Sequence, residues 1–200
     1  MITFRSLNRV GGPAVEPVTL AEAKTHCRVD TSSDDSYLAA LIVAAREYVE
    51  DYLDRTLIHT NWRMRLDGFP AEIELPRPPM AASGTNTAVT ITYTIGDSGG
   101  TAVLSTSEYR IDRDATPGVL RPLYGGSWPS HLFDQNSISV DWTGGFGTDG
   151  DSVPRVVRHA MLMILASWYE RRQAVDSVAA TEVPMGAKAL LDSAKWGQYA

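Results

Sequence analysis

The sequence is poor in the residues that build covalent or metal-bound frameworks. Cys27 is the single cysteine among 200 residues, which excludes an internal disulfide framework and an all-cysteine zinc site. Apart from the adjacent His26 and Cys27, which would point different ways on a helix, no histidine stands at metal-ligand spacing from a second ligand; the others are His59, His131 and His159. We therefore expect neither a metal nor a cofactor.

Long apolar runs and positive charge are also scarce. No apolar run approaches the roughly 20 residues of a membrane-spanning helix, and the N-terminal MITFRSLNRV lacks the apolar core of a signal peptide. The 18 Lys and Arg residues are outnumbered by 24 Asp and Glu residues, for a net charge of -6. This balance argues against a protein that grips nucleic acid through its phosphates. It still allows a protein that surrounds DNA without binding it, and we expect no membrane partner.

Residues 154–172 carry the clearest helical pattern in the chain. Pro154 suits the first turn of a helix, and Arg171 and Arg172 suit the negative end of its dipole. The rest of the girth is only weakly polar, so we expect a central helix that other helices cover, a scaffold and not a site. Apolar residues recur at steps of three and four and form one stripe: Val153, Val156, Val157, Ala160, Met161, Ile164, Leu165 and Trp168.

Two more helices are expected near the N-terminus. Thr19 and Glu22 have the spacing of a capping box, which predicts a short helix that ends near Arg28. A longer helix is predicted from about Asp34 to Arg55. Its apolar face consists of residues at helical spacing: Leu38, Leu41, Ile42, Ala45, Tyr48, Val49, Tyr52 and Leu53.

The other face of the longer helix is acidic. The simplest interpretation is a solvated face, partly neutralised by Arg46–Glu50 and Asp51–Arg55 pairs at four-residue spacing. The functional alternative is a face that meets a basic partner, or one that lines a passage through which DNA slides. The carboxylates recur at spacings of three, four and seven: Glu47, Glu50, Asp51 and Asp54.

From His59 to Trp142 the hydrophobic period changes to two, which predicts strands. Short turns such as Gly96–Gly100 favour antiparallel pairing. We expect Tyr124–Gln135 to be a surface loop in which Trp128 packs locally. The alternating segments are Asn61–Leu66, Ile73–Leu75, Val89–Ile95, Ala102–Leu104, Tyr109–Ile111, Val119–Arg121 and Ile138–Trp142.

A short last helix is predicted from Gly186 to about Lys195, after a link at 173–184. Helices at both ends of the chain with apolar faces too large to remain hydrated would pack on each other. The predicted fold is therefore α+β, a helical domain with an inserted antiparallel β block. The expected divisions are an N-terminal arm at 1–18, a helical core at 19–58 and 151–196, a β-rich insertion at 59–150, and a C-terminal tail at 197–200. The arm is either a disordered terminus or a segment that orders against a neighbouring subunit.

Two motifs resemble ligand-binding loops, but the residues around them argue against both. Gly145–Gly150 fits the G-x-G-x-x-G pattern, but antiparallel strands precede it and no strand completes a βαβ unit. We interpret it as a linker into the following helix. Asp112–Thr116 begins like a calcium loop but lacks the loop glycine and the final glutamate, so a polar turn is expected. The sequence offers no catalytic constellation, and we expect a protein that is not an enzyme.

Several short segments form a characteristic set when they are taken in order: Pro17–Lys24, Arg28–Asp30, Asp34-Asp35, Ala44–Glu50, Leu75–Pro79, Ile91–Tyr93, Val153-Pro154 and Trp168–Arg172. This set resembles the tailed-phage and gene-transfer-agent head–tail connector (adaptor) proteins. The resemblance spans nearly the whole chain, and the ordered set is more specific than any single motif. It departs at Val140–Gly147, where a smaller residue is expected before the glycine pair.

This resemblance implies a structural protein of a virion or phage-like particle, assembled in the bacterial cytoplasm. Its implied partners are copies of itself in a ring, dodecameric on the portal, then the portal protein and a tail-side stopper or tail terminator protein. DNA would pass through without specific binding. The implied portal contact falls on Leu190, Leu191, Trp196 and Tyr199. Two other functions are kept for comparison: a carbohydrate- or peptide-binding module that uses the β insertion, and a nucleotide-dependent enzyme that uses Gly145–Gly150.

Overall fold

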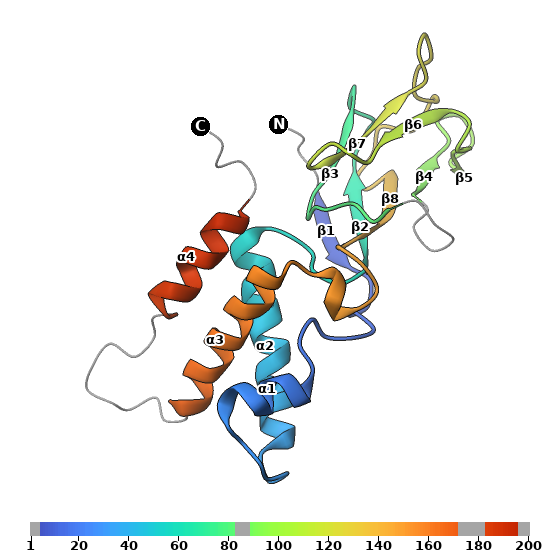
Figure 1. The fold of residues 1–200 in the computed structure, drawn as a ribbon. Helices are drawn as coiled ribbons and strands as arrows, with labels where there is room; N and C mark the ends of the chain where they lie inside the picture. The colour runs from blue at the N-terminus through green and yellow to red at the C-terminus, as the bar shows by residue number, and fades with distance from the viewer. Residues whose placement is uncertain (1–4, 83–88, 172–182, 196–200) are drawn as a thin grey trace. The chain divides into compact units, whose positions relative to one another are not determined.

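The protein is described by a computed structural model that covers residues 5–82, 89–171 and 183–195. The chain divides into two compact units (Figure 1). The β unit comprises Met1–Pro13 and His59–Phe146, and the helical unit comprises Ala14–Ile58 and Gly147–Ala200. Helices and antiparallel sheets are both present, so the predicted α+β class is confirmed. Most of the predicted link at 173–184 and the predicted tail at 197–200 lie outside the described residues.

The helical unit contains α1 (Leu20–Cys27), α2 (Asp35–Leu53), α3 (Arg155–Glu170) and α4 (Met185–Ala194). Helix α3 contacts the other three (Figure 1), which confirms the prediction of a central helix that packs on the long N-terminal one. Most of the predicted stripe is buried, but Val156 is 42% exposed. The buried stripe of α3 is Val157, Ala160, Met161, Ile164 and Leu165.

Local sequence signals set the ends of α1 and α2. The Glu22 N–H donates to Thr19 Oγ1 at 3.2 Å, and the Thr19 N–H donates to Glu22 Oε2 at 2.8 Å, so the predicted capping box is present. Both helices end in a left-handed residue, at Arg28 and Asp54. The apolar residues that α2 buries lie on one side, as predicted: Leu38, Ile42, Ala45, Val49 and Leu53.

Within the residues that the structure describes, the β unit contains two antiparallel sheets. The first has the order β1-β2-β8-β4-β5 and the second β3-β7-β6. All the strand pairs are antiparallel, as the short turns predicted. The strands are β1 (Ser6–Arg9), β2 (Thr60–Leu66), β3 (Ile73–Leu75), β4 (Thr90–Thr94), β5 (Thr101–Val103), β6 (Tyr109–Asp112), β7 (Gly118–Pro122) and β8 (Ile138–Gly144).

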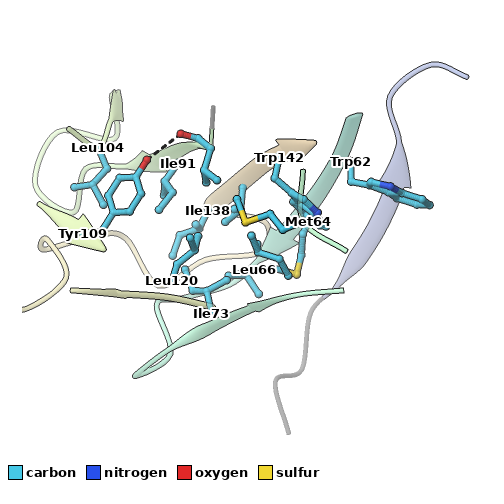
Figure 2. Close-up of a cluster of buried hydrophobic side chains, with 14 residues drawn as sticks. Trp62, Met64, Leu66, Ile73, Ile91, Leu104, Tyr109, Leu120, Ile138 and Trp142 are labelled. Atoms are coloured by element: carbon cyan, nitrogen blue, oxygen red, sulfur yellow. Dashed lines mark hydrogen bonds between the residues drawn. The ribbon is translucent and has the colours of Figure 1, made fainter. Parts of the chain in front are cut away.

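The core of the β unit is a cluster of buried side chains contributed by both sheets (Figure 2). Strand β2 alternates between buried and more exposed residues, whereas all but one of the β8 residues are buried. This pattern agrees with the place of β8 in the middle of the five-stranded sheet. Tyr109 brings a polar atom into the cluster, and its hydroxyl donates to the Val89 carbonyl at 2.9 Å (Figure 2).

Strand β1 lies in the segment 1–18 that is predicted to be an N-terminal arm. Its register partners on β2 run from Arg65, opposite Ser6, to Trp62, opposite Arg9. The Arg9 guanidinium also lies 5.3 Å from the centre of the Trp62 ring, within cation–π range. Residues 6–9 are therefore part of the five-stranded sheet.

Candidate functional site

The acidic stripe on α2 is the first predicted interaction surface. Glu47, Asp51 and Asp54 are exposed, as a partner-facing stripe requires. Glu50 is only 1% exposed, so its assignment to the exposed face is wrong. The exposed part of the stripe therefore contains three carboxylates, of which Glu47 and Asp51 lie on α2 and Asp54 is its C-cap residue.

Glu50 belongs instead to a buried ionic cluster. Arg46 Nη1 donates to Glu50 Oε2 at 2.9 Å, which confirms the predicted pair, and Arg46 Nε donates to Glu16 Oε2 at 2.8 Å. The second oxygen of Glu50 accepts the Leu57 N–H at 2.9 Å. Burial raises the pKa of Glu16 above its ordinary value despite the opposing attraction of Arg46. The cluster fastens the segments before α1 and after α2 to the helix, a structural role.

A second ionic cluster surrounds Arg158 on α3. Its guanidinium donates to the Pro17 carbonyl at 2.9 Å, to Asp151 at 2.7 Å and to Glu22 at 2.5 Å. The backbone hydrogen bond from Thr19 lowers the pKa of Glu22, and Arg158 contributes to the same shift. Arg158 thus connects the start of α3 to the start of α1 within the helical unit.

The glycine-rich segment before α3 is shaped by close contacts within its own unit. A Cβ on Gly150 would lie 2.5 Å from the Pro17 carbonyl oxygen, and one on Gly147 would lie 2.2 Å from Ser152 Oγ. The Ser152 N–H donates to Asp149 Oδ1 at 3.0 Å and caps a short 3₁₀ turn, Gly150–Ser152. These glycines permit close backbone packing, which accounts for the motif without a phosphate.

The two predicted portal-contact residues that the structure describes, Leu190 and Leu191, differ in burial. Leu191 is fully buried and holds α4 on the helical unit, while Leu190 is half-buried. The Tyr52 hydroxyl donates to Asp192 at 2.7 Å, and the Lys195 ammonium lies 4.7 Å from the centre of the Tyr52 ring. Trp196 and Tyr199 lie outside the described residues.

Two predicted local features of the β unit are confirmed. The Trp128 indole N–H donates to the Pro70 carbonyl at 2.6 Å, and its ring stacks on Phe69 at 4.9 Å between centroids. Trp128 therefore packs locally. In the turn after β6, Asp112 Oδ1 accepts the Ala115 N–H at 3.0 Å, which is the geometry of a polar turn.

An arginine pair on the three-stranded sheet was missed by the reasoning from sequence. Arg110 on β6 lies directly opposite Arg121 on β7, and both side chains are exposed. They line an open groove of about 520 Å³ together with Asp112, Arg113 and Asp114. The alternation of β6 and β7 could have placed each arginine outward, but only the pairing register brings the two together.

No group of three or more His, Cys, Asp or Glu side chains that could hold a metal occurs in the part of the chain that the structure describes. His26 and His159 do approach each other, with ring centroids 6.1 Å apart in an edge-on arrangement. The described helices include none that is both long and apolar enough to cross a membrane.

Comparisons with known proteins agree with the resemblance seen in the sequence. Residues 17–95 match the model of the phage gp6-like head-tail connector protein family. The search of curated proteins found no match. Among solved structures, similar chains occur in the necks and the virion of gene transfer agent (GTA) particles.

The structural likeness extends over almost the whole chain. A chain in the neck of an empty GTA particle, computed with sixfold symmetry, is 22% identical with a TM-score of 0.76, over 95% of both chains. A chain in the virion of the native particle is 22% identical with a TM-score of 0.75, over 94% of both. A chain in the native neck, computed with twelvefold symmetry, is 23% identical with a TM-score of 0.69, over 95% of this chain and 94% of that one. Residues 17–95 are thus similar to the phage gp6-like head-tail connector family, and the chain as a whole shares its fold with these neck chains.

Proposed function

We propose that this protein is a structural adaptor that forms a ring in the neck of a virion or phage-like particle and joins the head to the tail around the DNA channel. The observation that carries the proposal is the match of residues 17–95 to the head-tail connector family. The fold shared with neck chains of GTA particles supports it. The chain then acts by assembly and not by catalysis.

The proposed partners follow from a place in the neck. Copies of the chain form a ring of twelve on the portal protein, and a stopper or tail terminator protein binds on the tail side. A neck computed with twelvefold symmetry contains a chain of this fold, which supports this number. Assembly takes place in the bacterial cytoplasm, and the finished ring resides in the particle.

Two uses are available for the exposed carboxylates Glu47, Asp51 and Asp54. They either meet a basic surface on a neighbouring subunit or line the channel, where like charge keeps DNA from adhering to the wall. The portal contact would involve Leu190 together with Trp196 and Tyr199, because buried Leu191 is already committed to packing within its own helical unit.

The test is to mix the purified protein with the portal protein of its own particle and to examine the product by electron microscopy and native mass spectrometry. Rings stacked coaxially on the portal are expected. A protein that stays monomeric in the presence of a folded portal would refute the adaptor function. The alternative, a carbohydrate- or peptide-binding module, finds no support in the comparisons.

A further inference from the structure

The three-stranded sheet of the β unit carries two like charges side by side. Arg110 on β6 is the register partner of Arg121 on β7, and both side chains are exposed. Side chains directly opposite each other on neighbouring strands have Cβ atoms about 5 Å apart, and like charges at that distance are destabilising. A negatively charged partner would offset this repulsion.

The two arginines differ in what already neutralises them. Arg121 forms an ion pair with Glu72, through Nε at 2.8 Å and Nη2 at 2.6 Å from the same carboxylate oxygen. The Arg110 side chain has no hydrogen bond or ion pair to any residue in the described ranges 5–82, 89–171 and 183–195. The row of charges runs Glu72, Arg121, Arg110 and stops there, because β6 is an edge strand. A carboxylate beyond Arg110 would place an acidic group next to each of the two arginines.

The groove beside Arg110 is lined by both acidic and basic side chains, and this mixture limits the kind of partner that can bind there. Arg113 Nη1 donates to the Ala81 carbonyl at 2.8 Å, and Asp112 accepts the Ala115 N–H of its own turn. Asp112 and Asp114 both line the groove. A continuous polyanion such as a DNA backbone would be repelled by these two aspartates, whereas a partner with discrete carboxylates can meet Arg110 and Arg121 alone.

The chain itself carries carboxylates at a matching spacing. Glu47 and Asp51 are exposed on α2 and four residues apart, which places their Cβ atoms about 5–6 Å apart on one side of the helix. That separation agrees with the roughly 5 Å between the two arginines on neighbouring strands. We propose that Glu47 and Asp51 of one copy dock on Arg110 and Arg121 of a neighbouring copy.

This contact rests on the proposed function, because it assigns two of the surfaces that would meet in the ring. It joins two different faces of the same chain, one on α2 and one on the β6–β7 sheet. Such a heterologous contact generates a closed ring when the rotation between copies closes. The arrangement also gives the acidic stripe a basic neighbour in place of DNA.

The test uses complementary charge reversal in the full-length protein. The first variant carries Arg110→Glu and Arg121→Glu, and the second carries Glu47→Arg and Asp51→Arg. All four side chains are exposed, so both variants are expected to fold, which circular dichroism melting checks. The matched control is Arg155→Glu. Arg155 is exposed on α3 and belongs to neither of the two surfaces.

Ring formation on the portal protein is then counted by electron microscopy. Each variant alone should give rings at a yield lower by about tenfold or more, because attraction becomes repulsion at two positions. An equimolar mixture should restore the rings, since in alternating copies every acidic face meets a basic one. Arg155→Glu should assemble like the wild type.

The outcomes separate this contact from the adaptor function. If the wild type forms rings and each reversed variant forms them equally well, the contact is refuted while the adaptor function stands. If the mixture of the two variants fails to restore rings, the two surfaces are not partners across copies. If the wild type itself forms no ring on the portal, the proposed function fails and the contact fails with it.

Discussion

Glu50 lies one helical turn after Arg46 on α2, and the two side chains form a 2.9 Å ion pair in the interior of the helical unit. The exposed fractions of the two side chains are 1% and 3%. Desolvation of two such charges offsets much of their attraction, so the pair is weak evidence for stability by itself. Its remaining hydrogen bonds, to Leu57 and Glu16, give it the role of fixing two chain segments against α2.

Removal of one partner of this pair should be far more costly than replacement of both. Glu50→Ala leaves a buried guanidinium and an unpaired Leu57 N–H, and should lower the free energy of unfolding by about 3–5 kcal/mol. The double variant Arg46→Met, Glu50→Leu leaves the same Leu57 N–H unpaired but no buried guanidinium, so it should lose less. Urea denaturation followed by circular dichroism measures both, and Glu47→Gln on the exposed face should stay within about 0.5 kcal/mol of the wild type. Equal losses for the single and double variants would contradict this account.

The packing of α3 gives a second prediction. Ile164 is fully buried where α3 lies among the other helices, so Ile164→Asp places an unpaired charge in the core and should unfold the helical unit. Ile164→Val should cost only about 0.5–1.5 kcal/mol. Val156→Asp, on the same helix but 42% exposed, should remain folded. Thermal melts of the three variants test this, and a cooperative melt of Ile164→Asp near the wild-type temperature would show that the core is elsewhere.

The features that the sequence predicted well depend on neighbours close along the chain. The Thr19–Glu22 capping box, the Arg46–Glu50 pair and the apolar stripes of α2 and α3 all follow from spacings of three and four residues. These spacings fix which side of a helix a residue occupies. They do not reveal what covers that side.

The features that the sequence did not predict depend on partners far along the chain. Buried Glu50 accepts the Leu57 N–H, and Glu16 from before α1 pairs with Arg46 beside it, contacts that helical spacing cannot show. Residues 6–9 of the N-terminal arm form strand β1 because they pair with β2, which lies more than fifty residues further along the chain. The Arg110–Arg121 pair likewise arises from strand register alone. Non-local pairing of this kind leaves no periodic signal in the sequence.

The aromatic stack in the β unit makes a third prediction. Trp128→Ala removes a ring stacked on Phe69 and leaves the Pro70 carbonyl without its donor, and should cost about 3 kcal/mol. Trp128→Phe keeps the stacking and loses only the hydrogen bond, at about 1 kcal/mol. The matched control is Tyr124→Ala, since Tyr124 is 96% exposed and its removal should leave stability unchanged. Equal denaturation midpoints for Trp128→Ala and Tyr124→Ala would refute the assigned packing.

The Glu16 carboxylate makes the last prediction, which concerns pH. Burial raises its pKa above the ordinary value of 4.5, so the folded state binds the proton more tightly than the unfolded chain does. The free energy of unfolding should therefore increase as the pH falls through the pKa of folded Glu16 toward 4.5. At neutral pH, the charged carboxylate lowers the free energy of unfolding. Glu16→Gln keeps an acceptor for Arg46 Nε and removes that cost.

Glu16→Gln should thus be at least as stable as the wild type at pH 7, and its advantage should shrink as the pH approaches 4.5. Urea denaturation of both proteins across this range isolates the effect, because carboxylates with lowered pKa, such as Glu22, contribute equally to both. Glu22→Gln should show the opposite sign, since a lowered pKa gives stability at neutral pH that is lost on acidification. If Glu16→Gln instead destabilises the protein most at neutral pH, attraction to Arg46 outweighs desolvation, and the charged Glu16 stabilises the cluster.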